Sequence, residues 1–372
     1  MSILRWFSYP IFVMATILYV PMSLSARVID VRCIGNAAAD TNRLTNSIAS
    51  SKDGDLIRIH GACEVNQTIA LLSNRTYEGN SRTGSIIRQA DNANLPAVVA
   101  SDSWANNSPT TGSPTRIAHL KIDGNKASNT GTHGLLIRSW LTVIEDVQIQ
   151  NAPGDGILLT NRTRNGVTLT NTSVNGRISN VFVTGSGGIG IHVIDSGNSL
   201  TDWDLLDSWI ANSGQSGIYL ENAAGWKIVG NHIYGVRQHA LYANRCYGTT
   251  IADNYIEDFG RDGGADSIWY GIGCTVQGDV GSVIRDNKVF NGSSQPATGT
   301  FRFIGIPRVN YGTGVINVRG NVIRGRNEAA DNTALYYSGG SNPLRVTSTG
   351  NQVFSAGTPM TIGPNAVLVN GI

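Results

Sequence analysis

The sequence predicts an all-β fold, a solenoid in which short strands wind into a parallel β-helix. The chain of 372 residues has 44 glycines and only 15% charged residues, and this composition favours many turns over long helices. Groups of short apolar strands repeat along the chain, and asparagine returns at one corner of the repeat. Units of this kind bury their apolar faces only by stacking into one continuous core.

The first 26 residues have the layout of a secretory signal peptide. Arg5 precedes an apolar run, and small residues close the segment. The alternative is a membrane anchor, but Pro10 and Pro21 leave the run short of the roughly 20 residues that a spanning helix needs. We expect cleavage near Arg27, a mature domain of residues 27–372, and a protein secreted to the extracellular space or periplasm, without membrane attachment after processing.

The charge balance shows no electrostatic footprint for nucleic acid or for a membrane surface. The chain has 28 basic and 26 acidic side chains, for a net charge of +2. No basic stripe of the kind that tracks a phosphate backbone is present, so nucleic acid is not expected as a partner.

Export makes disulfides available to the four cysteines. We expect Cys33 and Cys63 to pair, because they flank the first ordered segment. Cys246 and Cys274 lie in neighbouring repeats, but the repeat register offsets them by about three positions. A second disulfide and two buried free thiols are both open for that pair.

The repeat is clearest in "WKIVGNHIYGVRQHALYANRCYG", residues 226–248, where three short apolar pieces are separated by turn residues. Corner asparagines recur at separations of 23, 33, 34 and 30 residues, at Asn231, Asn254, Asn287, Asn321 and Asn351. Asparagine tolerates a tight left-handed bend, and its amide can bond to the asparagine one rung above or below. An apolar residue follows two positions later and predicts one core column, formed by Ile233, Ile256, Val289, Ile323 and Val353.

The opening stretch "VIDVRCIGNAAADTNRLTNSIASSKDGDLIRIHGACEVNQTIAL" resembles the start of the pectate-lyase-like superfamily. That resemblance covers roughly residues 27–372 and implies a single-stranded, right-handed parallel β-helix with a short N-terminal capping helix. Residues 40–50 form the helix in this interpretation, with Leu44 and Ile48 one turn apart over the first rung. The chain departs from the family pattern at "NAAAD", where "GDG" is usual, and it lacks the usual proline before the glycine.

The resemblance leaves the reaction open, because the superfamily contains lyases, epimerases, hydrolases, fructan-processing transferases and phage tail proteins. The chain lacks the arginine signature and acidic calcium cluster of pectate lyases, the "NTD", "DD", "GHG" and "RIK" set of polygalacturonases, and the "DPH" of secreted mannuronan epimerases. No specific enzyme family is matched. Trimers are common among similar proteins, so a homotrimer is one arrangement that the resemblance allows.

One strand of each repeat follows the longest turn and alternates apolar and other residues. Alternation sends one set of side chains inward, namely Leu135, Ile157, Ile191, Ile218, Leu241 and Ile272. The neighbouring positions then point outward and form two columns: Leu136, Leu158, His192, Tyr219, Tyr242 and Gly273, then Arg138, Thr160, Ile194, Glu221, Asn244 and Thr275.

These outward columns predict the functional face, because they gather histidine, tyrosine and carboxylate side chains within about three rungs at 4.8 Å spacing. The predicted catalytic residues are His192, Tyr219, Glu221 and Tyr242. The predicted substrate-binding residues are His133, Arg138, Asp155, His239, Asn244, Arg245 and Trp269. The alternatives are an aromatic ladder for the two tyrosines and a turn-capping role for Glu221.

Two further features flank this face. The insertion of residues 257–270 is longer than its equivalents and is interpreted as a lid that brings Arg261, Asp262, Trp269 and Tyr270 over the patch. Asp262 and Asp266 are a weak calcium signal, and solvation accounts for them better, so no metal or other cofactor is expected. A second outward column, Gln148, Phe182, Trp209, His232, Tyr255 and Lys288, is interpreted as packing under a loop or against another subunit.

The sequence favours a secreted enzyme that acts on a polysaccharide, most specifically a lyase or C5-epimerase of a uronate-containing glycan. Such a reaction needs a base and an acid, which His192, Tyr219 or Tyr242 provide, and a cation for the carboxylate, which Arg138 or Arg245 provides. A glycoside hydrolase or an intramolecular fructan or glycosyl transferase needs two carboxylates. Asp155 and Glu221 are the only outward pair, and we expect three rungs, about 14 Å, between them, beyond the roughly 5 to 9.5 Å of glycosidase pairs. The third alternative is a non-catalytic glycan-binding or structural surface protein.

Overall fold

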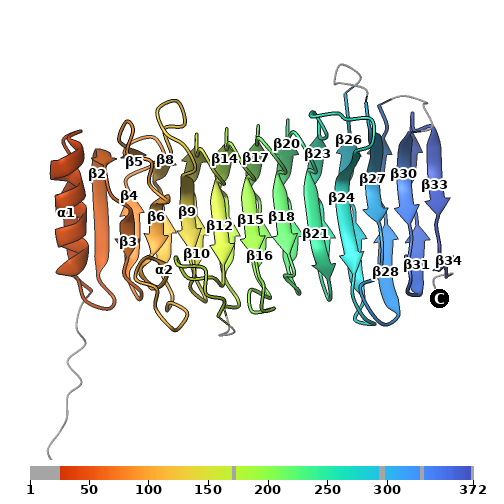
Figure 1. Ribbon diagram of the computed structural model, residues 1–372, viewed down its shortest axis with the longest axis horizontal. Helices are drawn as coiled ribbons and strands as arrows, with labels where there is room; N and C mark the ends of the chain where they lie inside the picture. Colours follow the sequence, from red (N-terminus) through yellow and green to blue (C-terminus); the bar gives the residue numbers. More distant parts are fainter. Residues whose placement is uncertain (1–25, 170–172, 293–297, 327–330, 370–372) are drawn as a thin grey trace, which may run out of the picture.

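The computed structural model describes residues 26–169, 173–292, 298–326 and 331–369. The predicted signal peptide lies outside the described residues except for its last position. The chain winds into one elongated coil, with helix α1 (Ala37–Ala49) at one end and the last strands at the other (Figure 1). Among the described residues, no helix has the length and apolar character needed to cross a membrane.

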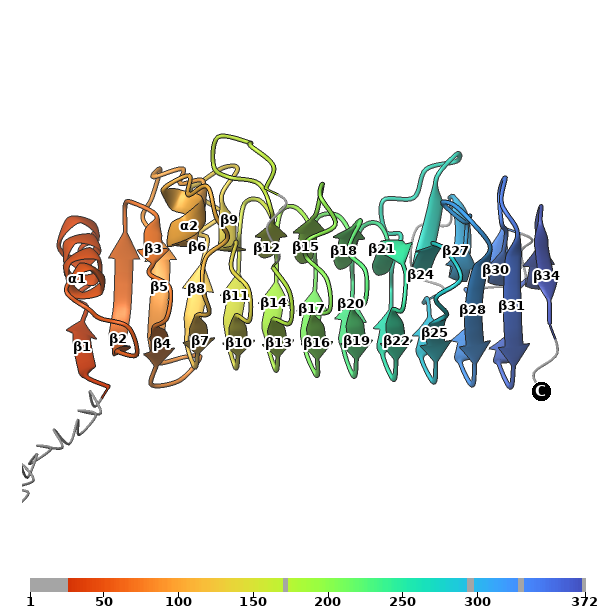
Figure 2. The ribbon, with the colours of Figure 1, turned by 90° about the horizontal axis from the view of Figure 1, so that it is seen from below.

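The coil consists of three parallel stacks of strands, here named sheets A, B and C, and each turn of the coil is one rung (Figure 2). Sheet A contains β1 (Val28–Arg32), β2 (Leu56–Val65), β4 (Thr76–Gly79), β7 (Arg116–Ala118), β10 (Val143–Glu145), β13 (Arg177–Ser179), β16 (Asp204–Leu206), β19 (Lys227–Val229), β22 (Thr250–Ala252), β25 (Ser282–Arg285), β28 (Gly314–Arg319), β31 (Leu344–Thr349) and β34 (Ala366–Leu368). Sheet B begins with the second half of β2 and continues with β5 (Ser85–Gln89), β8 (Lys121–Asp123), β11 (Gln148–Gln150), β14 (Phe182–Thr184), β17 (Trp209–Ala211), β20 (His232–Tyr234), β23 (Tyr255–Glu257), β26 (Lys288–Phe290), β29 (Val322–Arg324) and β32 (Gln352–Phe354).

Sheet C faces the viewer in Figure 1. It contains β3 (Ile69–Leu71), β6 (Ala97–Ser101), β9 (His133–Ile137), β12 (Ile157–Thr160), β15 (Ile191–Ile194), β18 (Ile218–Glu221), β21 (Leu241–Cys246), β24 (Ile268–Val276), β27 (Thr300–Ile306), β30 (Asn332–Tyr337) and β33 (Thr358–Ile362). All the strand pairs are parallel, so the predicted all-β parallel β-helix is confirmed.

The capping helix is confirmed and starts three residues earlier than the sequence suggests. Asn36 is its N-cap, and its side-chain oxygen accepts a hydrogen bond from the backbone N–H of Ala39 at 3.0 Å. Leu44 and Ile48 are buried at 0% and 4% exposure against the first rung. The helix therefore covers the apolar end of the coil, which would otherwise be an open edge.

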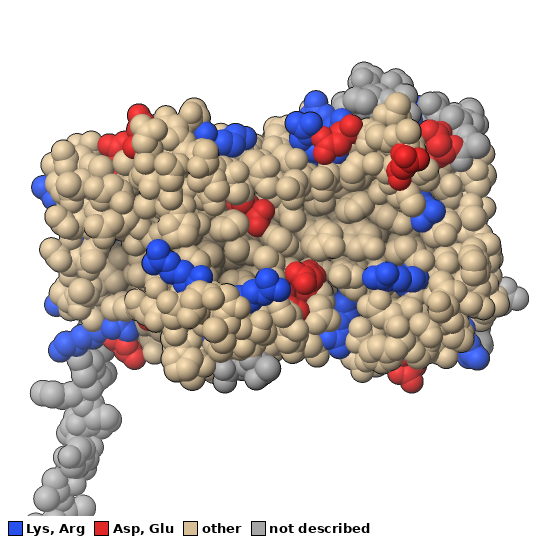
Figure 3. Space-filling view, in the orientation of Figure 1, with Lys and Arg blue, Asp and Glu red and all other residues tan. Residues whose placement is uncertain are grey.

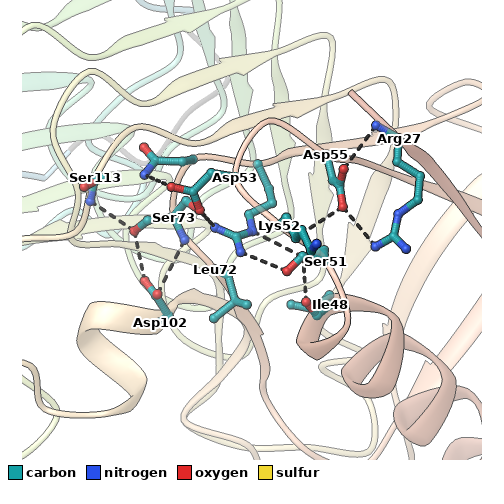
Figure 4. A network of polar contacts seen from close by, with 12 residues as sticks. Arg27, Ile48, Ser51, Lys52, Asp53, Asp55, Leu72, Ser73, Asp102 and Ser113 are labelled. Carbon is teal, nitrogen blue, oxygen red and sulfur yellow. Dashed lines mark hydrogen bonds and ion pairs between the residues drawn. The ribbon is translucent and has the colours of Figure 1, made fainter. Parts of the chain in front are cut away.

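A polar network fastens the cap to the first rungs (Figure 4). The carboxylate of Asp55 accepts hydrogen bonds from the backbone and the guanidinium of Arg27 and from the backbone N–H of Lys52. One rung on, the Ser73 hydroxyl donates to Asp102 at 3.2 Å and accepts from the backbone N–H of Ser113 at 3.0 Å. These bonds fix the loop that carries the short helix α2 (Asp102–Ala105).

The corner asparagines form the predicted ladder between sheets A and B. In each step the side-chain oxygen of one asparagine accepts from both the backbone N–H and the side-chain amide of the asparagine before it; the Asn254 amide, for example, lies 2.9 Å from the Asn287 oxygen. The same pair of bonds recurs along Asn231, Asn254, Asn287, Asn321 and Asn351. The apolar column beside the ladder is also in register, from Ile233 through Ile256, Val289 and Ile323 to Val353.

Both cysteine pairs are disulfides. The predicted Cys33–Cys63 bond has a Cα–Cα distance of 4.9 Å. Cys246 and Cys274, which the sequence left open, are also bonded, with a Cα–Cα distance of 5.8 Å. A β-bulge between Ala243 and Cys246 shifts the register, so that Cys246 pairs with Val276 instead of lying three positions from Cys274. The shift leaves both cysteines on the inner face, within bonding distance.

Candidate functional site

Helix α2 covers part of the first rungs of the outer face of sheet C, and the open face beyond it, from β15 to β27, is here named the groove. Over β9 and β12, helix α2 covers the outward column, and Trp104 packs with Leu136 and Leu158 in an apolar cluster. From β15 onward the same column is polar and aromatic. Figure 3 shows this face with few charges along its middle, while acidic and basic side chains gather along the upper and lower edges.

The structure brings the predicted columns together in the expected register. His192 pairs with Tyr219, and Tyr219 pairs with Tyr242, on adjacent rungs of β15, β18 and β21. The inward column is buried throughout, as at Ile191 and Ile218 with 0% exposure. The face chosen from the sequence is therefore the outer face, and its residues are neighbours in space.

A histidine and a carboxylate form the most specific contact in the groove. Nδ1 of His192 lies 2.8 Å from Oδ2 of Asp155, which sits in the turn before β12. The other carboxylate oxygen, Oδ1, accepts the backbone N–H of Ile189 at 2.8 Å. A Cβ added at Gly188 would lie 2.4 Å from that oxygen, so the turn can approach Asp155 this closely only because residue 188 is glycine.

The electrostatics of this pair keep Asp155 ionised. Burial alone would raise the pKa of Asp155, but the His192 hydrogen bond, the nearby imidazoles and the Ile189 N–H outweigh it, so the pKa is lowered. An ionised Asp155 holds the proton of His192 on Nδ1 and leaves the lone pair on Nε2, on the opposite edge of the ring. His192 is thereby set up to accept a proton at Nε2.

His133 lies on the other side of Asp155 and has a different role. Its Nδ1 accepts the backbone N–H of Asp155 at 3.1 Å, so the 3.5 Å approach of the same nitrogen to the Asp155 carboxylate is not a hydrogen bond. Burial lowers the pKa of His133. A neutral His133 positions the Asp155 backbone and does not compete with His192 for the carboxylate.

Two tyrosines continue the column beyond His192. The Tyr219 ring meets the His192 ring edge to face at 5.9 Å and stacks on the Tyr242 ring at 5.6 Å. Burial raises the pKa of Tyr219, helped by Tyr242 and Glu221, while the positive charge of Arg308 opposes the rise. A protonated phenol is therefore held one rung from the imidazole, and the two stacked tyrosines form an aromatic ladder beside His192.

His239 lies behind these tyrosines as part of the groove wall. Its Nδ1 accepts the backbone N–H of Tyr270 at 3.2 Å, and its ring lies 4.9 Å from Tyr242 and 5.6 Å from Trp269. Burial lowers the pKa of His239 to about 4. The ring is thus neutral at physiological pH and contributes shape and a buried acceptor to the wall.

The lowered pKa of His239 predicts an acid-sensitive fold. Below pH 6.5 His239 takes up a proton in the unfolded chain, whereas in the folded chain it stays neutral down to about pH 4. Protonation in this pH range favours the unfolded state, so the fold loses stability on acidification. The variant His239→Gln retains an acceptor for the Tyr270 N–H. Between pH 7 and pH 4, we expect its free energy of unfolding to fall by up to about 3 kcal/mol less than that of the wild type. Urea unfolding of both proteins at the two pH values measures this difference, and equal losses would contradict the assignment.

Arg138, the predicted carboxylate partner, does not face the groove. Its side chain is 1% exposed, and its guanidinium donates to three backbone carbonyls of the α2 loop, those of Ser103, Ser108 and Thr110. Strand alternation alone would leave the side chain of Arg138 exposed on the outer face. The α2 loop folds over the first rungs and buries this side chain. We therefore remove Arg138 from the candidate site.

Glu221, Asn244 and Arg245 lie at the far edge of the groove. Glu221 ends β18 and is close enough to Tyr219 to affect the pKa of the phenol. The backbone oxygen of Asn244 accepts from Asn310 at 3.3 Å, and Arg245 donates to Asn222 at 3.4 Å. These residues form the lower edge and do not contact Asp155 or His192.

The expected spacing of Asp155 and Glu221 is wrong by one rung. β12 pairs with β15 and β15 with β18, so two rung spacings separate them, about 10 Å. Glu221 is in register with Ile194 and Thr160. Thr160 lies five residues beyond Asp155, which adds roughly 16 Å along the strand. The two carboxylates therefore remain too far apart for a glycosidase pair.

Sequence reasoning missed two arginines of the groove. Arg302 on β27 is in register with Tyr270, donates to the Tyr270 hydroxyl at 2.8 Å, and lies 3.5 Å from the centre of the Tyr336 ring. Arg308 is exposed and close enough to influence Tyr219. The two outward columns, extended by one rung, reach Gly305 and miss Arg302, which is in register with Tyr270 at the outward position before them. Arg308 follows its strand, and no periodic signal in the sequence marks it.

Only some of the residues in the insertion of residues 257–270 lie against the candidate site. Trp269 and Tyr270 pack against His239, whereas Asp262 pairs with Arg237 at 2.5 Å over the turns between sheets B and C. Among the described residues, no group of three or more His, Cys, Asp or Glu side chains is placed to hold a metal ion.

The second aromatic column is in register on sheet B, with Trp209 stacked on His232 at 5.4 Å. Trp209 is 46% exposed. No loop of the described chain therefore buries Trp209, and the alternative of packing against another subunit stays a prediction.

Comparisons with known proteins agree with this architecture. The polygalacturonase of Erwinia carotovora ssp. carotovora superposes with a TM-score of 0.61 at 11% identity, over 93% of this chain and 96% of that one. The tailspike of Escherichia coli bacteriophage HK620, in complex with a pentasaccharide, gives 0.58 at 13% identity over 88% and 63%. The mannuronan C-5 epimerase AlgE4 A-module of Azotobacter vinelandii gives 0.54 at 15% identity over 89% and 95%.

The chain spans 43% to 63% of the length of four phage tailspikes that it matches, and no curated protein sequence matches it. The family model described as "Right handed beta helix region" matches residues 118–369. Since that match covers more than half of the chain, the protein belongs to the family of right-handed parallel β-helix proteins.

Proposed function

We propose that this protein is a polysaccharide-acting enzyme, a lyase or C5-epimerase of a uronate-containing glycan, with its active site in the groove of sheet C. The observation that carries the proposal is the pair of Asp155 and His192 one rung from the protonated phenol of Tyr219. A base and an acid on one face are what both reactions require. A polygalacturonase and a mannuronan C-5 epimerase with the same fold make a uronate polymer a reasonable first substrate class.

The proposed chemistry starts with proton transfer from C5 of the sugar to Nε2 of His192. In elimination, the C4–O bond then breaks as the C4=C5 double bond forms, and the Tyr219 hydroxyl gives its proton to the leaving oxygen. In epimerisation, the C4–O bond stays intact, and C5 receives a proton from a water molecule on the opposite side of the sugar ring, while His192 returns the proton that it removed to solvent. Arg308, whose charge acts on Tyr219, is the cation that we place opposite the uronate carboxylate.

Hydrolysis and glycosyl transfer are less well supported. They need two carboxylates at glycosidase spacing, whereas Asp155 is engaged with His192 and Glu221 lies farther away. We also propose that the protein works outside the cytoplasm, because two disulfides require an oxidising compartment.

Screening tests the proposal directly. Alginate, pectate and glycosaminoglycans are incubated with the protein, and the ultraviolet absorbance of an unsaturated uronate and the NMR spectrum of the polymer are recorded. We expect one acidic polymer to yield new absorbance or an inverted C5 centre. Activity confined to neutral glycans, with release of saturated oligosaccharides, would contradict it.

Asp155 is proposed as a positioning residue for His192. In Asp155→Asn, the amide oxygen can still accept the Ile189 N–H, but the amide NH2 that replaces Oδ2 offers no acceptor to Nδ1 of His192. We expect kcat to fall about 100-fold with KM within about threefold, and the urea unfolding midpoint to stay close to that of the wild type. A parallel loss of stability and activity would show that Asp155 merely supports the turn.

A further inference from the structure

A second pocket lies beside the groove, on the turns that lead from sheet B to sheet C. It has a volume of about 510 Å³ and is lined by Lys126, Ser186, Gly187, Asn212, Ser213, Gly214, Gly235, Arg237 and Arg261. Three of these residues are cationic and none is acidic. Basic side chains gather at the upper edge of the sheet C face in Figure 3. No residue of this pocket belongs to the site of Asp155 and His192.

The three cations differ in how they are neutralised. Arg237 is paired with Asp262, whose carboxylate lies 2.5 Å from its Nε. Lys126 and Arg261 are exposed and contact only backbone carbonyls, Lys126 that of Gly185 at 2.6 Å and Arg261 that of Gly235 at 3.4 Å. Within the described part of the chain, no carboxylate lies within ion-pair distance of either, so two positive charges are available to a ligand.

The two charges are held at a defined spacing. Gly185, Asn212 and Gly235 occupy successive rungs, because each backbone N–H bonds to the rung that follows. The anchoring carbonyls of Lys126 and Arg261 are therefore two rungs apart, about 10 Å, with Asn212 between them on the pocket floor. That arrangement suits an extended ligand with anionic groups along its length better than a single small anion.

The pocket is joined to the proposed active site by a short turn. Ser186 and Gly187 line the pocket, Gly188 and Ile189 contact Asp155, and His192 follows on β15. A glycan chain in the groove would thus carry its substituents past this edge.

We propose that Lys126 and Arg261 form an anion subsite that binds carboxylate groups of an acidic polysaccharide next to the His192 site. This inference rests on the proposed function for the identity of the ligand. The subsite would make the protein selective: it would prefer the polymer with ionised carboxylate groups over its methyl ester, because only the ionised group interacts with the cations.

Binding in the absence of turnover tests the subsite. In a His192→Gln background, affinities for alginate and polygalacturonate oligosaccharides, for methyl-esterified oligogalacturonate and for a sulfated neutral glucan are measured by calorimetry at two salt concentrations. We expect Lys126→Met with Arg261→Gln to weaken binding of the acidic oligosaccharides about 100-fold, about tenfold for each cation. The salt dependence should decrease as well.

The matched control is Arg237→Gln, which removes a cation from the same pocket that Asp262 already neutralises. It should weaken binding less than about threefold. Unchanged affinity of the double variant would overturn the subsite, and so would an equal loss of affinity for the methyl ester. Turnover of a uronate polymer by the wild type would in either case still support the proposed function. Dependence on Lys126 and Arg261 for the sulfated glucan alone would overturn the carboxylate assignment and identify a sulfate ester as the ligand.

Discussion

Replacing His192 by glutamine is expected to lower kcat on the uronate substrate by about 10²- to 10⁴-fold, with glycan affinity within a few fold of the wild type. The imidazole is held by Asp155 at 2.8 Å and lies beside Tyr219, so its loss removes the proton acceptor while the groove keeps its shape. Steady-state kinetics and binding to the same oligosaccharide separate the two effects.

A second histidine and aspartate pair provides the matched control. Nε2 of His60 lies 2.6 Å from Asp30, on β1 and β2 of sheet A, away from the groove. His60→Gln should leave kcat unchanged, since it removes the same kind of contact at a remote place. If His192→Gln retained more than about a third of wild-type kcat, His192 would not be the catalytic base.

Replacing Asn287 by alanine is expected to lower the free energy of unfolding by about 4 kcal/mol. Asn287 is fully buried, accepts from the backbone and the amide of Asn254, and donates to Ile251 and Asn321. Alanine removes all four bonds and leaves buried donors and acceptors without partners, and each such group costs about 1–3 kcal/mol. Urea unfolding, followed by circular dichroism, measures the loss.

The position within the ladder should decide the size of the effect. Asn351 stands at the last rung and is only partly buried, so Asn351→Ala should cost about half as much because water replaces some of the lost bonds. Asn310, an exposed asparagine with one long bond of 3.3 Å, is the control and should change stability by less than about 0.5 kcal/mol. Equal losses at Asn287 and Asn310 would contradict the role of the ladder.

The fold was predictable from the sequence because its determinants are periodic. Strand alternation placed Ile191 inside and His192 outside, and the spacing of the asparagines placed their corner between two sheets; both are confirmed in the register. Alternation and asparagine spacing depend only on contacts between neighbouring rungs. Along the ladder these contacts recur every 23 to 34 residues.

The candidate site was predictable only where a residue's position depends on that same repeat. Arg138 was misplaced because the α2 loop, which has no counterpart in the other repeats described here, folds back over its strand. The pairing of Cys246 depends on a β-bulge, and the contact of Asp155 with His192 depends on the path of one glycine-rich turn. Bulges and turns leave no periodic signal, so these details required the structure.

The fate of the C5 proton tests the central claim most directly. The wild type and His192→Gln are incubated in D2O with whichever uronate polymer the screen identifies, and the products are followed by NMR. We expect the wild type to remove the C5 proton, seen as a C4=C5 double bond at new chain ends or as deuterium at C5 of an intact chain, and His192→Gln to do neither. New reducing ends on sugars that all keep their original C5 proton would contradict it, because cleavage would then proceed without the base that the Asp155–His192 pair is proposed to provide.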